Sequence, residues 1–461
     1  MATSPDHPTT RTSSEAAMHR PTCPVPLSRL ALVAALAINA SSALGQTQPQ
    51  NPSAQEQLLQ RIDLLARELE RVKAELQQLK QAQPTAQPTT QPAAPAPAAL
   101  PPVAAAPATR TEPATVISGY GEINYNRPKD GSQAQADIRR FVIGLQHRFD
   151  ERSKLVSELE VEHAIASSSD KGEVEVEQLY IEHRLNDTYG LRAGLFLMPV
   201  GLLNTNHEPT AYYGVERNFV ETAIIPSTWR EGGVQLFGEH DSGISWAAGI
   251  STGFDLGKWD GKAKDGRQSP LASIHQEMQL AKARSLAWFG SVDWRGIPGL
   301  RLGASVFGGN AAQGAPGFAS PDAKVGLWDV HAKWTPGAWD LSAVYARGSI
   351  SGAGDFNLTL AGAPTPVPNA FDGWYTQAAY RWQLGGDRTL APFVRYERYN
   401  TGRGFDGLPA GLNPGAYGTE TVRTVGLNFY LNPGIVLKAD LQRFSLDSGR
   451  NRVDLGVGYA F

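Results

Sequence analysis

Apolar and polar residues alternate along most of the chain, from Val116 to Phe461, in segments of about nine residues that Gly, Pro, Asn and Asp separate. Alternation with a period of two is typical of a strand with one apolar and one polar face. Sixteen strands are predicted, and they begin near Val116, Asp137, Leu155, Glu175, Tyr189, Glu231, Ile244, Ser285, Leu300, Leu327, Trp339, Gly373, Leu390, Thr421, Ile435 and Arg452. Residues 116–461 are therefore expected to form an all-β domain.

The connections between these segments alternate between short and long. Short turns are expected at residues 150–154, 185–188, 240–243, 295–299, 335–338, 383–389 and 431–434, and longer connections at 198–230, 253–284, 308–326, 348–372 and 400–420. A soluble sandwich has no reason for this alternation, whereas an outer-membrane barrel has tight turns on one side and long loops on the other. The pattern predicts a 16-stranded antiparallel transmembrane β-barrel in the bacterial outer membrane.

The two faces of the predicted strands differ in chemistry. In the last strand one face carries Val453, Leu455, Val457, Tyr459 and Phe461, and the other carries Arg452, Asp454, Gly456, Gly458 and Ala460. The strand near Trp328 repeats the pattern, with Trp328, Val330, Ala332 and Trp334 opposite Asp329, His331 and Lys333. Strand ends carry tryptophans that suit two aromatic girdles, namely Trp294, Trp334, Trp339 and Trp382 beside short turns and Trp328 and Trp374 beside long loops. The apolar face is expected to meet lipid and the polar face to line a wet lumen.

The N-terminus has the three parts of a secretory signal peptide. Arg20 and Arg29 precede an apolar run at residues 30–40, and the small residues Ala43 and Gly45 precede a cut before Gln46. We expect residues 1–45 to be the signal peptide, with Met18 as an alternative start. A short buried helix is the other interpretation, because the run is too short to span a membrane.

Residues 54–82 carry a heptad repeat. Apolar residues fall at Leu58, Ile62, Leu65, Leu69, Val72, Leu76 and Leu79, and glutamates at g positions (Glu68, Glu75) match lysines at e positions (Lys73, Lys80). The charges favour a parallel homo-oligomer of two, three or four chains, and a lone amphipathic helix is the alternative. Residues 83–115, rich in Pro and Ala, are expected to be an extended linker. An even number of strands would place the coiled coil in the periplasm.

Charge and cysteine content exclude several classes of protein. With 42 Lys and Arg against 45 Asp and Glu, the net charge is −3, so the basic excess of a nucleic-acid binder is missing. The single cysteine, Cys23, lies in the signal peptide, so the mature chain is expected to have no disulfide and no Cys-ligated metal. No cofactor is expected.

The predicted lumen carries both signs of charge in similar number. The lumen-facing basic positions are Arg140, Arg148, Arg184, Arg192, Arg301, Lys333, Arg381, Arg395, Lys438 and Arg452. The acidic positions are Glu122, Glu158, Glu160, Glu162, Glu182, Asp293, Asp329, Asp340, Glu397, Asp440 and Asp454. Because selectivity follows the field at the narrowest point of a pore, a few clustered arginines can still select anions.

Other chemistry is sparse. One cluster suggests a metal site, and it consists of Glu158, Glu160, Glu162 and His163, near His183. Alternating carboxylates on a strand are, however, more simply explained as a solvated lumen face. Residues 119–121 are not followed by a helix and form no nucleotide-binding loop. No serine lies in a nucleophile-like context near the lumen histidines. The chain is therefore not expected to be an enzyme.

Several segments together resemble the phosphate-selective porin O and P family. They are residues 138–145, 155–162, 194–201, 215–220, 230–236 and the terminal 459–461, and they follow the barrel in order. The resemblance implies a homotrimer of 16-stranded barrels whose third long loop, here residues 198–230, folds into the lumen and narrows it. It also implies an arginine pair at Arg139 and Arg140, of which regular alternation lets only Arg140 face the lumen. The family's central loop lysine has no counterpart, because residues 198–230 contain no Lys.

Three functional hypotheses follow. The first is a porin for passive diffusion of small solutes, with anions such as phosphate expected and the anion path formed by Arg139, Arg140, Arg148, Arg192, Arg217, Arg301, Arg381 and Arg395. Arg140 is expected to be the main attractor, and Arg217 to contribute from the loop. The second is a general or cation-preferring porin, as the balanced lumen charge suggests. The third is a tether, in which the coiled coil reaches the cell wall and the barrel anchors it in outer-membrane lipid.

Overall fold

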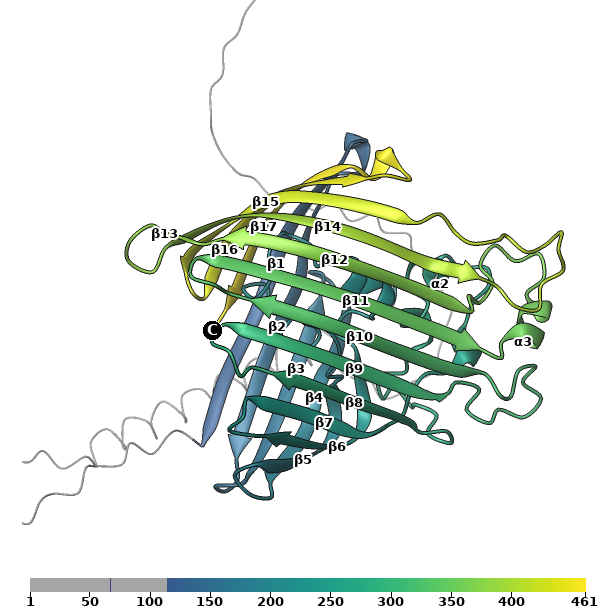
Figure 1. The fold of residues 1–461 in the computed structure, drawn as a ribbon, viewed down its shortest axis with the longest axis horizontal. Helices are drawn as coiled ribbons and strands as arrows, with labels where there is room; N and C mark the ends of the chain where they lie inside the picture. The colour runs from purple at the N-terminus through teal and green to yellow at the C-terminus, as the bar shows by residue number, and fades with distance from the viewer. Residues whose placement is uncertain (1–66, 68–113) are drawn as a thin grey trace, which may run out of the picture. The chain divides into compact units, whose positions relative to one another are not determined.

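The computed structural model describes residues 67 and 114–461 (Figure 1). The chain divides into two units, residues 1–106 and 107–461, and the strands belong to the second. The signal peptide, the coiled coil and most of the linker lie outside the described residues, and they stay predictions. In the part of the chain that the structure describes, no helix is both long and apolar enough to cross a membrane.

The second unit is one antiparallel sheet that closes on itself. Its strands are β1 (Thr115–Pro128), β2 (Gln135–Arg148), β3 (Ser153–Glu162), β4 (Glu173–Arg184), β5 (Tyr189–Leu197), β6 (Arg230–Glu239), β7 (Ile244–Ser251), β8 (Ala287–Trp294), β9 (Leu300–Asn310), β10 (Lys324–Trp334), β11 (Trp339–Ser351), β12 (Ala370–Tyr380), β13 (Trp382–Gln383), β14 (Thr389–Gly404), β15 (Glu420–Asn432), β16 (Ile435–Phe444) and β17 (Arg452–Ala460). Closure comes from β1, which pairs with β2 on one side and β17 on the other.

The wall of the barrel contains sixteen strands, as predicted. The sheet has 17 strand segments, but β12 and β13 both pair with β14 and are separated only by Arg381, so they form one wall strand. Each predicted strand begins within three residues of an observed one. The agreement is close because turn residues mark nearly every reversal of the chain.

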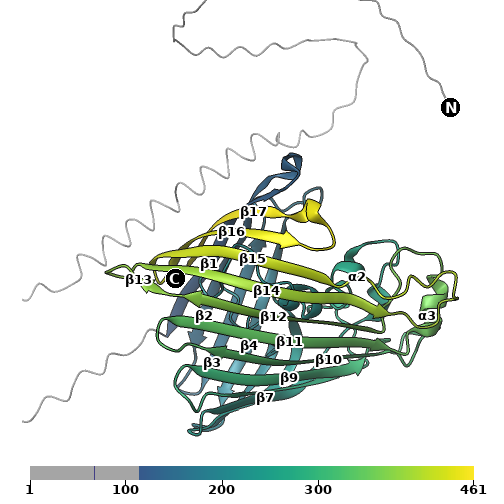
Figure 2. The same cartoon turned by 45° about the horizontal axis from the view of Figure 1, so that its top comes forward.

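Long and short connections gather at opposite ends of the barrel. The long connections carry the short helices α2 (Asp265–Gln268) and α3 (Gly354–Thr359), which lie together at one end, and the C-terminal residue lies toward the other (Figures 1 and 2). Further short turns of helix are η1 (Gly131–Gln133), η2 (Val220–Ile224), η3 (Leu256–Lys258), η4 (Ala272–Ile274) and η5 (Ser448–Arg450). We call the two ends the long-loop end and the short-turn end.

The alternation of faces is confirmed. In β17 the side chain of Val453 is 44% exposed on the outer face, whereas its neighbour Asp454 is fully buried inside. The outer face is not uniform around the barrel, because tryptophans occur only on β7 to β13 among the strands described. The outer faces of β2 to β4 instead present large aliphatic residues and one phenylalanine.

Candidate functional site in the barrel lumen

The connection between β5 and β6, residues 198–229, folds into the lumen, as the resemblance implied. Both ends of this lumen loop are fixed in an apolar cluster, where Met198 and Trp229 have no exposed surface. The Trp229 ring stacks on Phe254 at 5.1 Å between centroids and meets the edge of Phe307 at 4.8 Å. Since aromatic packing of this kind is rigid, the loop leaves the wall in a defined direction.

The tip of the lumen loop reaches the wall opposite its origin. Gly214 adopts a φ of +87°, in the left-handed region, and its N–H donates to Asn428 of β15 at 3.1 Å. The next N–H, from Val215, donates to Asp440 of β16 at 2.7 Å. The N–H of Phe219 donates to Glu397 of β14 at 2.6 Å. Three strands of the far wall thus accept backbone hydrogen bonds from the loop.

Two adjacent tyrosines extend the contact to other strands. The Tyr212 hydroxyl donates to Glu122 of β1 at 2.6 Å, and the Tyr213 hydroxyl donates to Asp340 of β11 at 3.1 Å. Burial, followed by the neighbouring carboxylates, raises the pKa of both phenols well above its ordinary value. Both tyrosines are therefore neutral donors to carboxylates, and they fix the loop across the barrel.

Glu221 organises the loop from within. Its buried carboxylate accepts hydrogen bonds from the N–H groups of Leu202 at 2.6 Å and Leu203 at 2.8 Å. It also accepts from the Asn218 side chain and from the hydroxyl of Tyr375 on β12, both at 2.9 Å. One side chain thus joins the start of the loop, its tip and the wall.

Five lumen carboxylates accept hydrogen bonds from the loop, namely Glu122, Asp329, Asp340, Glu397 and Asp440. Of the eleven acidic positions predicted to face the lumen, eight are buried: Glu122, Glu160, Glu182, Asp329, Asp340, Glu397, Asp440 and Asp454. Of the ten basic positions, only three are buried: Arg140, Arg395 and Lys438. The similar numbers in the sequence therefore do not describe the accessible surface, which is richer in cations.

A cavity of about 780 Å³ lies between the loop tip and the long-loop end. Its charged lining consists of Arg139, Arg140, Arg217 and Arg452 against Glu122 and Glu216. The three arginines predicted from the paired site and the loop, at positions 139, 140 and 217, are thus brought together.

The expectation that only one arginine of the pair faces the lumen is wrong. Glu122 pairs with Arg140, but the next residue of β1 pairs with Ile138, so Arg139 is the extra residue of a β-bulge. A bulge interrupts the alternation and leaves two successive side chains on one side of the sheet. Ile138 and Phe141 face outward on either side of the pair.

A second cavity, of about 570 Å³, lies on the short-turn side of the loop, and a narrow one of about 50 Å³ shares lining residues with both. Tyr212 lines both the narrow cavity and the one at the long-loop end, and Asn206 and Arg301 line both the narrow cavity and the one at the short-turn end. About 50 Å³ holds only a few water molecules, so this is the smallest of the three cavities.

The narrow cavity has a basic lining. Its charged residues are Arg301, Lys333 and Arg395, and no carboxylate lines it. Each cation has an acidic partner outside this lining: Asp293 lies 2.6 Å from Arg301, Asp340 lies 3.4 Å from Lys333 and Glu397 lies 2.8 Å from Arg395. Of these partners, Asp293 lines the neighbouring cavity of about 570 Å³. Lys333 was placed in the lumen by the sequence but was not among the predicted anion-path residues, because the pattern did not show where the loop would end.

The predicted arginines differ in how their charge is balanced. Arg140 is buried and lies 2.9 Å from Glu122, 3.1 Å from Glu160 and 3.8 Å from Glu162. Arg217 instead donates to neutral acceptors, namely the hydroxyls of Ser227 at 2.5 Å and Thr228 at 2.7 Å and the carbonyl of His207 at 3.1 Å. Its Nε is buried without a hydrogen-bond partner among the described residues.

The other predicted arginines lie nearer the short-turn end. Arg192 lines the cavity on that side and donates to Glu182 at 2.8 Å. Arg381 lies with its guanidinium 5.4 Å from the Tyr430 ring, and Arg148 ends β2. Neither Arg148 nor Arg381 lines the three lumen cavities.

Among the described residues, no group of three or more His, Cys, Asp or Glu side chains is arranged to hold a metal ion.

A closed 16-stranded barrel with a loop folded into its lumen is the fold of the bacterial outer-membrane porins. OmpF of Salmonella typhi, solved in complex with daunomycin, superposes with a TM-score of 0.52 at 14% identity, over 75% of this chain and 97% of that one. The outer membrane channel DcaP of Acinetobacter baumannii gives a TM-score of 0.47 at 14% identity, over 75% of this chain and 97% of that one.

The chain is also 31% identical over 341 residues to an uncharacterized protein of Aquifex aeolicus (strain VF5), a match that covers 71% of this chain and 75% of that protein. It belongs to the same family as that protein. No protein-family model matches the chain. The comparisons therefore support a porin fold and do not point to the phosphate-selective family in particular.

Proposed function

We propose that this protein is an outer-membrane porin for passive diffusion of small solutes, that it prefers anions, and that phosphate is among them. The observation that carries the proposal is Arg217, which lines the cavity of about 780 Å³ and donates only to neutral acceptors. The narrow cavity adds Arg301, Lys333 and Arg395, and the carboxylate that pairs with each of them does not line that cavity. A field of one sign in a narrow, low-dielectric passage concentrates ions of the opposite sign.

Arg217 has the main role in this proposal. Because its hydrogen-bond acceptors are neutral, its charge is not compensated by an adjacent carboxylate. A guanidinium of this kind can hold an anion by charge-assisted hydrogen bonds. Arg140, by contrast, shares its charge with Glu122 and Glu160, so we assign it a structural role in holding β1, β2 and β3 together. Phosphate affinity is expected to be low, because the loop carries no lysine.

The sign of selectivity tests the proposal. Purified protein in a planar bilayer under a KCl gradient is expected to give a reversal potential with the sign of the chloride equilibrium potential, as an anion-selective channel does. Replacing chloride by phosphate is expected to leave a measurable current, without block by low phosphate concentrations. A reversal potential of the opposite sign would support the general or cation-preferring porin. A protein that inserts but does not conduct would support the tether.

We also propose a homotrimer. The outer faces of β2 to β4 present a continuous apolar surface free of tryptophan, in which each side chain is at least 40% exposed: Ile138, Phe141, Ile143, Leu159, Val174, Val176, Leu179 and Ile181. Tryptophan favours the lipid–water interface, and it is missing from the described strands β14 to β17 and β1 to β6. The outer faces of β2 to β4 lie within this part of the wall, which suits contact with another barrel. The heptads of residues 54–82 add a parallel contact of the same symmetry.

Replacing Leu65, Leu69 and Leu76 by polar residues is expected to lower the temperature at which the trimer dissociates. The reason is that these residues form the apolar seam of the predicted coiled coil. The measurement is the temperature of heating at which the oligomer band disappears on gels. Ala74→Ser, at an outer heptad position, is the control and should leave that temperature unchanged. Equal dissociation temperatures for the triple variant and the control would show that the heptads do not contribute.

The role as a tether to the cell wall rests on the same heptads and on the linker that follows them. Both lie outside the described residues, so this role stays a prediction from the sequence. It is compatible with a channel, because the barrel can conduct and anchor at once.

A further inference from the structure

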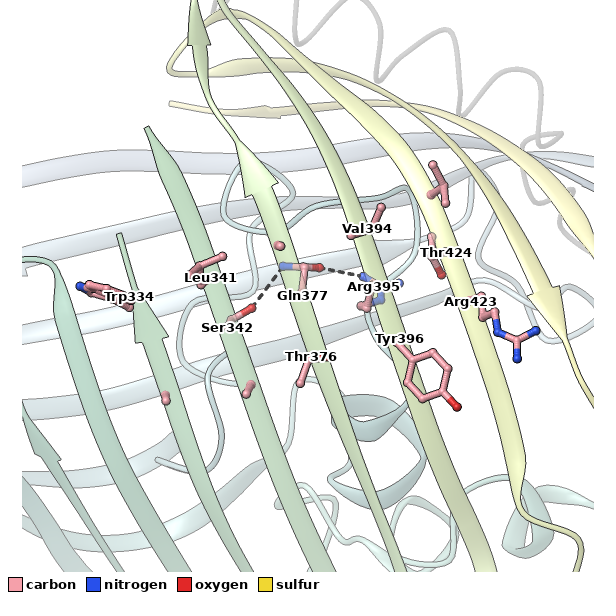
Figure 3. Close-up of a pocket in the computed structure, with 14 residues that line it drawn as sticks. Trp334, Leu341, Ser342, Thr376, Gln377, Val394, Arg395, Tyr396, Arg423 and Thr424 are labelled. Atoms are coloured by element: carbon pink, nitrogen blue, oxygen red, sulfur yellow. Dashed lines mark hydrogen bonds between the residues drawn. The ribbon is translucent and has the colours of Figure 1, made fainter. Parts of the chain in front are cut away.

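A groove of about 580 Å³ lies on the outer wall of the barrel, across β10 to β15 (Figure 3). Strand pairing explains it. Ala332, Ala343 and Thr376 lie side by side on the outer faces of β10, β11 and β12. Larger side chains stand on the rows beside them, with Leu341 on one side and Tyr345 on the other. Small residues between large ones leave a depression, and the side chains that form it are mostly apolar.

Beyond Tyr396, the same row of paired positions contains two arginines. Thr376 pairs with Tyr396 of β14, Tyr396 with Arg423 of β15, and Arg423 with Arg443 of β16. Tyr396 and Arg423 line the end of the groove, and the guanidinium of Arg423 lies 5.9 Å from the Tyr396 ring (Figure 3). Arg443 is exposed on the same outer face.

This pair of arginines needs an explanation. Like charges directly opposite on neighbouring strands destabilise a sheet. Among the residues that the structure describes, neither Arg423 nor Arg443 has a carboxylate within ion-pair distance. An anion that binds both guanidiniums would remove the repulsion.

The height of the pair on the barrel restricts what the anion can be. Trp374 and Tyr396 pack together on the outer face at 5.5 Å between ring centroids, and Arg398 pairs with Trp374 on the same face. Aromatic rows of this kind mark the level of lipid headgroups. The arginines therefore lie at headgroup level, and the groove runs from them along the apolar wall.

We propose that this groove binds a phosphorylated lipid of the outer leaflet, with its phosphate on Arg423 and Arg443 and an acyl chain in the groove. Charge complementarity selects the headgroup, because two arginines at paired positions of neighbouring strands suit a group with several anionic oxygens. The apolar depression beside them selects a lipid over a soluble anion, because only a lipid has a chain to fill it. The site is outside the lumen and does not depend on the channel.

The test uses the full-length protein in detergent and native mass spectrometry, with diphosphoryl lipid A as the probe, phosphatidylcholine as the neutral lipid and inorganic phosphate as a competitor. The unmodified protein is expected to retain diphosphoryl lipid A in preference to phosphatidylcholine. Arg423→Gln with Arg443→Gln is expected to weaken retention by about tenfold or more, since a charge-assisted hydrogen bond to each arginine is lost. Arg127→Gln, an exposed arginine on the outer face of β1, is the matched control and should not change it.

A second variant tests the contribution of the groove independently of the two arginines. Ala343→Phe fills the depression without changing any charge, and it is expected to weaken lipid retention. Its change in gel mobility on heating should equal that of the unmodified protein, which shows that the barrel is folded. Equal retention by the unmodified protein and the double arginine variant would overturn the proposal. Displacement of the lipid by inorganic phosphate alone, or unchanged retention in Ala343→Phe, would overturn the assignment of a lipid. Unchanged bilayer conductance in these variants is expected, so the result is independent of the channel proposal.

Discussion

Arg217→Glu is expected to convert the channel from anion to cation preference. The guanidinium of Arg217 lines the cavity of about 780 Å³ at the loop tip and is held there by neutral acceptors, so a carboxylate in its place reverses the local field. Focused fields in narrow passages change local ion concentration by about tenfold or more, and the ratio of chloride to potassium permeability should fall by a similar factor. The measurement is the reversal potential in a KCl gradient.

Salt dependence and a conservative variant make this prediction specific. The shift should be larger at low salt than at high salt, because screening shortens the reach of the remaining charges. Arg217→Lys keeps the positive charge and should keep the sign of selectivity, although it loses part of the hydrogen-bond geometry. A reversal potential that is the same in Arg217→Glu and the unmodified protein would show that the loop arginine does not set selectivity.

Glu221→Ala is expected to open the channel. The variant removes the acceptor of four hydrogen bonds that join residues 202 and 203, Asn218 and the barrel wall at Tyr375. Each buried donor left without a partner costs about 1–3 kcal/mol, so the loop should leave its position across the lumen. Single-channel conductance is expected to rise and to fluctuate, because the narrow cavity of about 50 Å³ is formed largely by this loop.

Glu216→Gln is the matched control for this variant. Glu216 is a carboxylate on the same loop that lines the cavity and accepts one hydrogen bond, from Asn126 at 3.1 Å. Its loss changes the charge of the path without releasing the anchor, so conductance should stay near that of the unmodified protein. If Glu221→Ala conducts like this control, the loop is not the barrier to ion flow.

The side of the barrel that Arg140 faces could be predicted from the sequence, but its ion-pair partners could not. Alternation correctly placed it in the lumen, and its charge made it the expected attractor. Its partners, Glu122 and Glu160, lie 18 and 20 residues away along the chain, on β1 and β3. Lateral pairing of strands brings the three together, and the periodicity of any one strand carries no signal of it. Arg139 was misplaced for a related reason, because a bulge depends on how β1 and β2 pair and not on the residues of β2 alone.

The sequence by itself determined the barrel. A period of two assigns each residue to a face, turn residues mark each reversal, and the alternation of short and long connections distinguishes a membrane barrel from a sandwich. These features are local, so they can be read along the chain. Only the tertiary structure decided which charges line the path. The loop tip binds carboxylates as far away as 225 residues, as in the contact of Val215 with Asp440, and burial of those acids leaves the cations facing the lumen. Contacts at such separation depend on where a closed barrel places its far wall, which no local pattern encodes.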